Sequence, residues 1–178
     1  DSSSSRGLGD VYKRQVVSRD EAFDRIKAAV DARQEGTDIL IMGRTDANHT
    51  HGLDEAIHRG KQYQEIGADI VFIEAPKTVE EMETICREVP GCHMANIVEG
   101  GLTPNLSMEQ LQDVGFQFVA YPLTLLAASM QAMKQTLELM RQDLPRANHL
   151  MDFEELRDRI GFNEYYETSQ VYETSRRS

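Results

Sequence analysis

The sequence predicts an α/β protein with parallel strands in one sheet. Short continuous apolar runs, typical of strands covered on both faces, alternate with stretches whose apolar residues recur at helical spacing. Short connections between such units favour parallel strands joined by right-handed crossovers. The pattern fits either a doubly wound open sheet or part of a closed barrel. It slightly favours the open sheet, because 178 residues fall well short of the about 250 of a typical barrel.

The first helix is expected to begin at a capping box, in which Ser18 and Glu21 bond each other's backbone amides, and to end near Gly36. The apolar run at 39–42 then predicts a strand buried on both faces, which stops at 43–46. Similar signals predict three further strands, at 70–73, near 93–98 and at 116–121. The helices between them are expected from 53 to near 67, from the capping box at 78 to about 90 and from the capping box at 107 to 115. A long helix at about 123–141 and a last helical piece at about 153–166 follow the last strand.

Charge and cysteine content indicate which partners and compartment to expect. The formal net charge is -11, which argues against nucleic acid or an anionic membrane as a partner because both are polyanions. The two cysteines, Cys86 and Cys92, form no Cys-x-x-Cys pair and no disulfide framework, so a reduced cytoplasmic protein is expected. No apolar run approaches the roughly 18 residues of a membrane span.

Polar residues follow each expected strand. Arg44, Thr45 and Asp46 follow the first strand, and Glu74 ends the second. Asn96 and Glu99 lie at and after the third, and Tyr121 ends the fourth. The carboxyl ends of parallel strands share one face, where ligands bind. Arginine matches a carboxylate with two parallel hydrogen bonds, asparagine can donate to it, and a buried glutamate can act as acid or base. A small carboxylate is therefore the expected ligand; the alternative is that Arg44 and Glu74 only pair with each other.

Five blocks in order resemble the isocitrate lyase/phosphoenolpyruvate mutase family. They are residues 42–47 (MGRTDA), 52–57 (GLDEAI), 67–75 (GADIVFIEA), 96–104 (NIVEGGLTP) and 115–123 (GFQFVAYPL). The resemblance extends from about Val16 to the end of the long helix.

The resemblance implies the C-terminal half, strands five to eight, of a TIM-type (β/α)8 barrel. Residues 16–145 are then the half barrel and 146–178 a C-terminal helical tail, while the Ser-rich residues 1–15 look like a non-native leader. The long helix is expected to be swapped between the subunits of a homo-oligomer, a tetramer.

The same resemblance implies a Mg2+-dependent lyase that cleaves or forms a C–C bond in small 2-hydroxy di- or tricarboxylates of the methylisocitrate or dimethylmalate type. Glu74 is the expected catalytic residue, and Arg44, Asn96, Glu99 and Tyr121 are expected to bind substrate. In the family, the Mg2+ ligands and a cysteine-bearing loop come from the preceding half, so this chain alone is expected to hold no metal and to be inactive.

Two alternatives stay open. Within the family, the protein could be an oxaloacetate decarboxylase or a C–P bond mutase or hydrolase. In a different class, it could be a non-catalytic flavodoxin-like or assembly module. Some methylisocitrate lyases have threonine at the position of Val98, which weakens an assignment to that substrate. The polar stretch 48–51, with two histidines, predicts a solvated loop rather than a metal site.

Overall fold

The computed structural model describes residues 16–36 and 38–174, so the predicted leader at 1–15 lies outside the described residues. The chain divides into two compact units, with the boundary between Leu125 and Leu126. Each unit is described by itself below.

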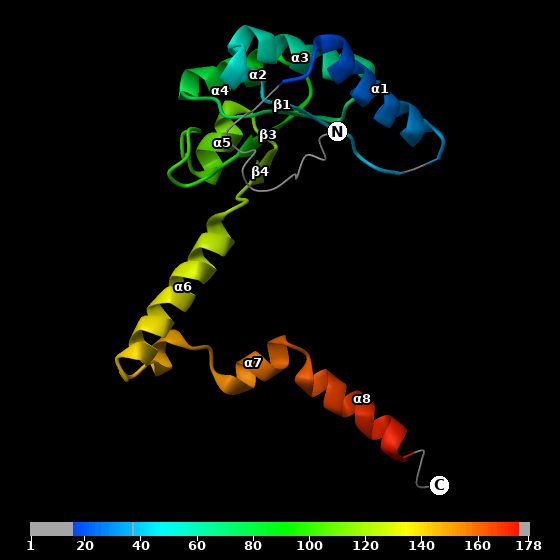
Figure 1. Ribbon diagram of the computed structural model, residues 1–178. Coiled ribbons are helices and arrows are strands. Elements are labelled where there is room, and N and C mark those ends of the chain that lie inside the picture. The colour runs from blue at the N-terminus through cyan, green and yellow to red at the C-terminus, as the bar shows by residue number, and fades with distance from the viewer. Residues whose placement is uncertain (1–15, 37, 175–178) are drawn as a thin grey trace, which may run out of the picture. The chain divides into compact units, whose positions relative to one another are not determined.

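Unit 1 contains a parallel sheet of four strands in the order β1-β2-β3-β4. This confirms the predicted α/β class. The strands are β1 (Met42–Thr45), β2 (Ile70–Ile73), β3 (Cys92–Asn96) and β4 (Phe118–Ala120). The helices are α1 (Arg19–Gln34), α2 (Ala47–Thr50), α3 (Leu53–Ile66), α4 (Val79–Glu88) and α5 (Met108–Val114), and Figure 1 shows α3 and α4 along the same side of the sheet.

The two faces of the sheet differ in burial. In β1, Gly43 and Thr45 are buried, whereas Met42 and Arg44 on the opposite face are exposed. Gly43 lies so close to α3 that a Cβ atom there would stand 2.7 Å from Cδ2 of Tyr63, so only glycine fits. The helices therefore cover one face and leave side chains such as Arg44 available on the other.

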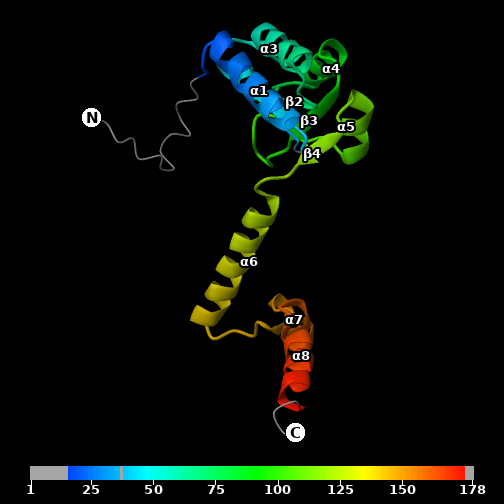
Figure 2. The ribbon, with the colours of Figure 1, turned by 90° about the vertical axis from the view of Figure 1, so that its right-hand side faces the viewer.

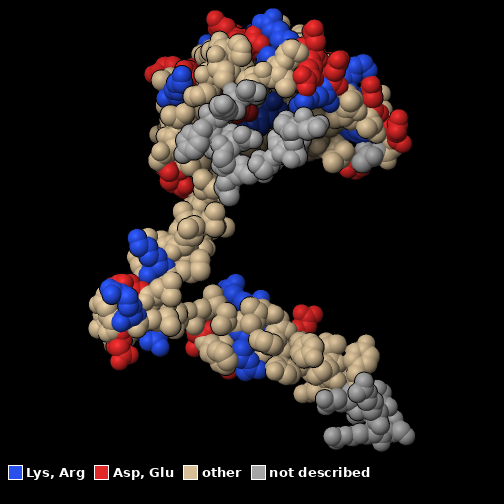
Figure 3. Space-filling view, in the orientation of Figure 1, with Lys and Arg blue, Asp and Glu red and all other residues tan. Residues whose placement is uncertain are grey.

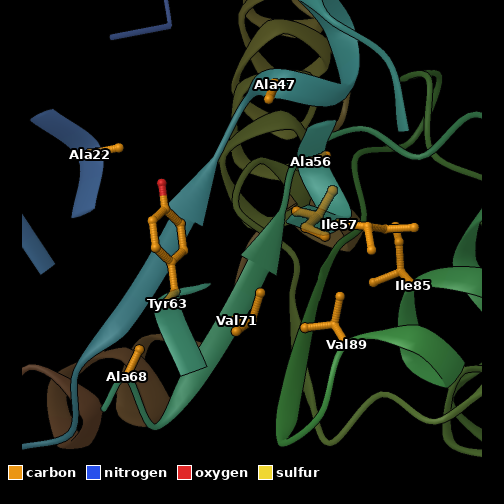
Figure 4. Packing of buried hydrophobic residues seen from close by; sticks show 10 residues of the cluster. Ala22, Ala47, Ala56, Ile57, Tyr63, Ala68, Val71, Ile85 and Val89 are labelled. Atoms are coloured by element: carbon orange, nitrogen blue, oxygen red, sulfur yellow. The ribbon is translucent and has the colours of Figure 1, made fainter. Parts of the chain in front are cut away.

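The core lies between the sheet and its helices. Figure 4 shows one cluster, in which Ile57 of α3 and Ile85 of α4 meet Val71 of β2. A second cluster joins Met82 of α4 to Leu111 of α5. Both clusters hold the strand ends of unit 1 in place, because their side chains come from successive strand–helix units.

The start of the first strand differs from the prediction. Ile39 and Leu40, expected inside a buried strand, are 58% and 66% exposed, and the strand begins only at Met42. The reason is position: β1 is the edge strand of the sheet among the described residues, so a run before it has no neighbouring strand on its outer side.

Unit 2 is helical. It contains most of α6 (Thr124–Arg141), a short 3-10 turn (Ala147–His149), α7 (Phe153–Arg159) and α8 (Phe162–Thr174), which are visible in Figure 2. The predicted last helical piece is thus two helices, interrupted at Gly161 with its φ of 81°. Figure 3 shows an uncharged surface on the first part of α6, in agreement with its sequence. Within the described residues, no helix is both long and apolar enough to cross a membrane.

Candidate functional site

A cavity of about 410 Å3 opens where the strands of unit 1 end. Its polar end is formed by Arg44 of β1, Glu74 directly after β2 and Asn96 at the end of β3. Its apolar wall includes Val98, Leu102 and Leu123. Three of the predicted site residues therefore lie together, as the shared face of parallel strands requires.

Arg44 is held on three sides. Its Nε and Nη2 atoms donate to the two carboxylate oxygens of Asp46 at 2.9 and 3.0 Å. Nη2 also lies 3.2 Å from Oε2 of Glu74, and the guanidinium carbon stands 4.9 Å from the ring centroid of Phe72. The hydrogen bonds that Arg44 donates to Asp46 are the largest cause of the raised pKa of Arg44, so the side chain keeps its charge.

Glu74 is buried and fixed by its neighbours. Its amide donates to the carbonyl of Thr45 at 3.0 Å, which continues the β1–β2 pairing by one residue. Its Oε2 accepts from Nδ2 of Asn96 at 3.5 Å in addition to facing Arg44. The ion pair between Arg44 and Glu74, which was the alternative to ligand binding in the sequence analysis, is therefore present. It lies inside the cavity that would receive a ligand.

The loop after β2 is anchored from α2. Ala75 has a φ of 56°, an uncommon conformation for a residue other than glycine. The buried side chain of Asn48 donates to the carbonyl of Ala75 at 3.0 Å and to Glu81 at 3.3 Å. This contact stabilises the backbone directly after Glu74, so the prediction of a solvated loop at 48–51 is wrong for Asn48.

The charges of the cluster limit what it can bind. One guanidinium, that of Arg44, stands beside two carboxylates, those of Asp46 and Glu74. Arg44 and Asn96 can donate to a carboxylate, and Glu74 can accept a proton or a hydroxyl hydrogen bond. A dianionic ligand would nevertheless be repelled by these two carboxylates, so a further cation beside them would strengthen its binding.

Glu99 and Tyr121 lie outside the cavity lining. Oε1 of Glu99 accepts from the hydroxyl of Thr124 at 2.7 Å, and this hydrogen bond lowers the pKa of Glu99. The hydroxyl of Tyr121 lies 3.5 Å from the sulfur of Met108. Their predicted contact with substrate stays a prediction.

The residues that the structure describes do not fit a Mg2+ site. They include no group of three or more histidine, cysteine, aspartate or glutamate side chains able to hold a metal ion. Both cysteines are free, and burial raises the pKa of Cys86 to about 12, so its thiol stays protonated. Among the described residues, no side-chain cluster can therefore be assigned to a cation, and Cys86 supplies no thiolate.

The predicted site residues did not include Asp46 and Asn48. Asp46 was named among the polar residues that follow the first strand, but its contact with Arg44 was not predicted. The role of Asn48 depends on Ala75, which is distant in sequence, so no local pattern could have indicated it.

Known proteins resemble this chain in sequence and in fold. The family model described as phosphoenolpyruvate phosphomutase matches residues 3–141. The 2,3-dimethylmalate lyase of Eubacterium barkeri is 39% identical over 171 residues, which cover 94% of this chain and 59% of that protein. The chain thus spans somewhat more than half the length of this relative.

Solved structures give the same result. A 2,3-dimethylmalate lyase, described as a PEP mutase/isocitrate lyase superfamily member, matches 92% of this chain and 56% of its own with a TM-score of 0.81 and 30% identity. An oxaloacetate acetylhydrolase in complex with the inhibitor 3,3-difluorooxalacetate matches the same shares with a TM-score of 0.81 and 27% identity. The resemblance inferred from the five sequence blocks is confirmed, and the chain belongs to the phosphoenolpyruvate phosphomutase family.

Proposed function

We propose that this chain provides the carboxylate-binding side of the active site of a lyase, which cleaves or forms a C–C bond in small 2-hydroxy di- or tricarboxylates of the methylisocitrate or dimethylmalate type. The observation that carries the proposal is the cluster of Arg44, Glu74 and Asn96 at the ends of three parallel strands. Arg44 and Asn96 bind a substrate carboxylate, and Glu74 serves as the acid or base. Glu99 and Tyr121 provide further substrate contacts.

The fold part of the proposal is that β1–β4 are strands five to eight of a (β/α)8 barrel. Two observations support it: the exposed side chains on the helix-free face of β1, and the 59% share of the dimethylmalate lyase that the chain covers. The remaining strands would cover that face. They would also bring the ligands of Mg2+, the further cation that the two carboxylates beside Arg44 call for.

The assembly part is a homo-oligomer, a tetramer, in which α6 is swapped between subunits. The exposed apolar side chains of α6, among them Met130, Met133 and Leu137, support this because such surface is costly in water. The free cysteines Cys86 and Cys92 agree with a cytoplasmic location.

Ligand binding tests the site. We expect oxalate, the smallest dicarboxylate, to shift the side-chain NMR resonance of Arg44 in a titration at constant ionic strength. Arg44→Ala should weaken binding by about 2–5 kcal/mol, the usual cost of leaving a buried charge partner without its contact. Arg87→Ala, which removes an exposed arginine of α4, is the matched control and should leave the affinity unchanged. Equal affinity in the unmodified chain and Arg44→Ala would refute the assignment.

Turnover tests the half-barrel proposal. The 178-residue chain, assayed with Mg2+ against methylisocitrate, 2,3-dimethylmalate and oxaloacetate, should show no activity, because the described residues include no group of side chains able to hold the metal ion. Activity in a cooperatively folded monomer of this chain would contradict the role assigned to the other strands.

A further inference from the structure

The side chain of Asp46 bonds to Arg44 rather than to the helix that it precedes. Asp46 is the N-cap residue of α2, where an aspartate ordinarily accepts hydrogen bonds from the first amides of the helix. Here it makes no such bond, and both of its carboxylate oxygens face Arg44 instead. The backbone of Asp46 still starts the helix, since its carbonyl accepts from the amide of His49 at 3.2 Å.

The contacts of Arg44 leave one edge of the guanidinium for a ligand. Asp46 occupies Nε and Nη2, Glu74 shares Nη2, and the ring of Phe72 lies against the planar face. Among the residues that the structure describes, none accepts a hydrogen bond from Nη1. The arginine side chain is half exposed, whereas its two carboxylate partners are more buried, so these partners and the ring of Phe72 hold it in place.

We propose that Asp46 is a positioning residue, which holds the Nε and Nη2 atoms of Arg44 and thereby presents the Nη1 edge to a carboxylate in the cavity. The identity of the ligand rests on the proposed function; the contact between the two side chains does not. Ordering a long side chain before binding removes an entropy cost that would otherwise reduce affinity.

A substitution of Asp46 distinguishes a positioning role from a simple effect of its charge, because the two predict opposite changes in the affinity for an anion. If Asp46 were only a negative charge near the site, Asp46→Asn would reduce repulsion and strengthen the binding of an anion. If Asp46 positions Arg44, the same variant weakens binding, since asparagine has one neutral acceptor oxygen and an NH2 group in place of the second, and cannot form the two parallel charge-assisted hydrogen bonds.

The experiment measures two quantities on the full chain. The first is the oxalate affinity from NMR titration at constant ionic strength, and the second is the solvent-exchange rate of the Nε proton of Arg44. In Asp46→Asn we expect affinity to fall about two- to tenfold, the range for one side chain that must be ordered on binding. The Nε proton of Arg44 should exchange faster. Asparagine and serine both suit an N-cap, so Asp46→Ser provides a second folded variant with the same expected outcome.

The matched control is an exposed pair with the same geometry. In α6, Nε and Nη2 of Arg141 donate to the two oxygens of Glu138 at 3.0 and 2.7 Å. Glu138→Gln should release the Nε proton of Arg141 and change neither Arg44 nor the oxalate affinity.

Stronger or unchanged oxalate binding in Asp46→Asn, or an unchanged exchange rate at Arg44, would overturn the positioning role. If the unmodified chain binds no oxalate but Arg44 still loosens in Asp46→Asn, the proposed function fails while the contact between Asp46 and Arg44 is upheld. The two proposals therefore fail in different measurements.

Discussion

Units 1 and 2 both contain amphipathic helices, but only unit 1 buries them. The buried apolar residues of the described chain lie between Ala22 and Phe116, and none belongs to α6, α7 or α8. Leu111 of α5 is 0% exposed, whereas Leu137 of α6 is 64% exposed. The difference shows that a helical apolar stripe indicates a contact surface, while a neighbouring element decides whether the contact forms within the same unit.

Ion pairs within helices also differ in burial between the two units. Glu55 and Arg59 in α3 are four residues apart, as are Glu155 and Arg159 in α7. Arg59 is 4% exposed and Glu55 also pairs with Arg19, whereas both partners of the α7 pair are exposed. The same sequence spacing therefore creates a buried network in one unit and a solvated surface pair in the other.

The largest effect is expected from breaking the buried network. Glu55→Gln should lower the free energy of unfolding by about 3–5 kcal/mol, because it leaves the guanidinium of Arg59 buried without a charged partner. The pKa of Glu55 is lowered from 4.5 to about 2, chiefly by its hydrogen bond with Arg19. The carboxylate thus stabilises the fold above its unfolded pKa, and this stability is lost as the pH falls through about 2.

Urea unfolding of the chain measures this effect, and Glu155→Gln is the control. The exposed pair should contribute only about 0.3–0.5 kcal/mol. Equal losses for the two substitutions would contradict the contrast between the units.

The next largest effect on the free energy of unfolding is expected from shortening a buried leucine, in comparison with an exposed one. Leu111→Ala should cost about 2–5 kcal/mol, because it removes methyl groups from a closed cluster and leaves a cavity. Leu137→Ala should change the free energy of unfolding by at most about 0.5 kcal/mol in the monomer. Urea unfolding at low protein concentration checks both, and a large loss for Leu137→Ala would show that unit 2 has a core of its own.

A smaller effect is expected on self-association through α6. If Met133 becomes buried between subunits, Met133→Gln removes about 1.5–3 kcal/mol and should raise the dissociation constant about ten- to a hundredfold. Sedimentation equilibrium measures the constant. Gln135→Ala lies nearly opposite on the helix and should have no effect. A strictly monomeric unmodified chain at high concentration would rule out the intersubunit contact.

The smallest effect concerns the pH dependence of unit 1. Burial lowers the pKa of His93, whose Nε2 lies 2.9 Å from the carbonyl of Val89. Because the folded state favours the neutral ring, stability is complete above the unfolded pKa of about 6.5. It falls below that pH, by at most about 1.4 kcal/mol per pH unit. Urea unfolding between pH 5 and 7 checks this.

His93→Gln keeps a donor for Val89 and should remove this slope, whereas substitution of the exposed His149 by glutamine should preserve it. An unchanged slope in His93→Gln would assign the pH dependence to other groups.

The predicted elements were most accurate where local signals are strong. The helix that begins at Ser107 has the predicted capping box, and the strand Ile70–Ile73 is buried throughout. Such signals act within a few residues, because a cap satisfies amides of its own helix and a continuous apolar run excludes a solvated face. The convergence of Arg44, Glu74 and Asn96 was also predictable, because parallel strands place their carboxyl ends on one edge.

The sequence by itself determined the parallel α/β order of unit 1, the family and the identity of the polar residues at the strand ends. Those properties depend on periodicity, on capping and on the order and spacing of short motifs within the chain. The tertiary structure alone decided that Ile39 and Leu40 are exposed, that Asn48 anchors Ala75, and that Asp46 bonds Arg44 instead of capping α2. Each of these depends on which group lies nearby in space, and an exposed edge or a choice between two hydrogen-bond partners leaves no periodic pattern in the sequence.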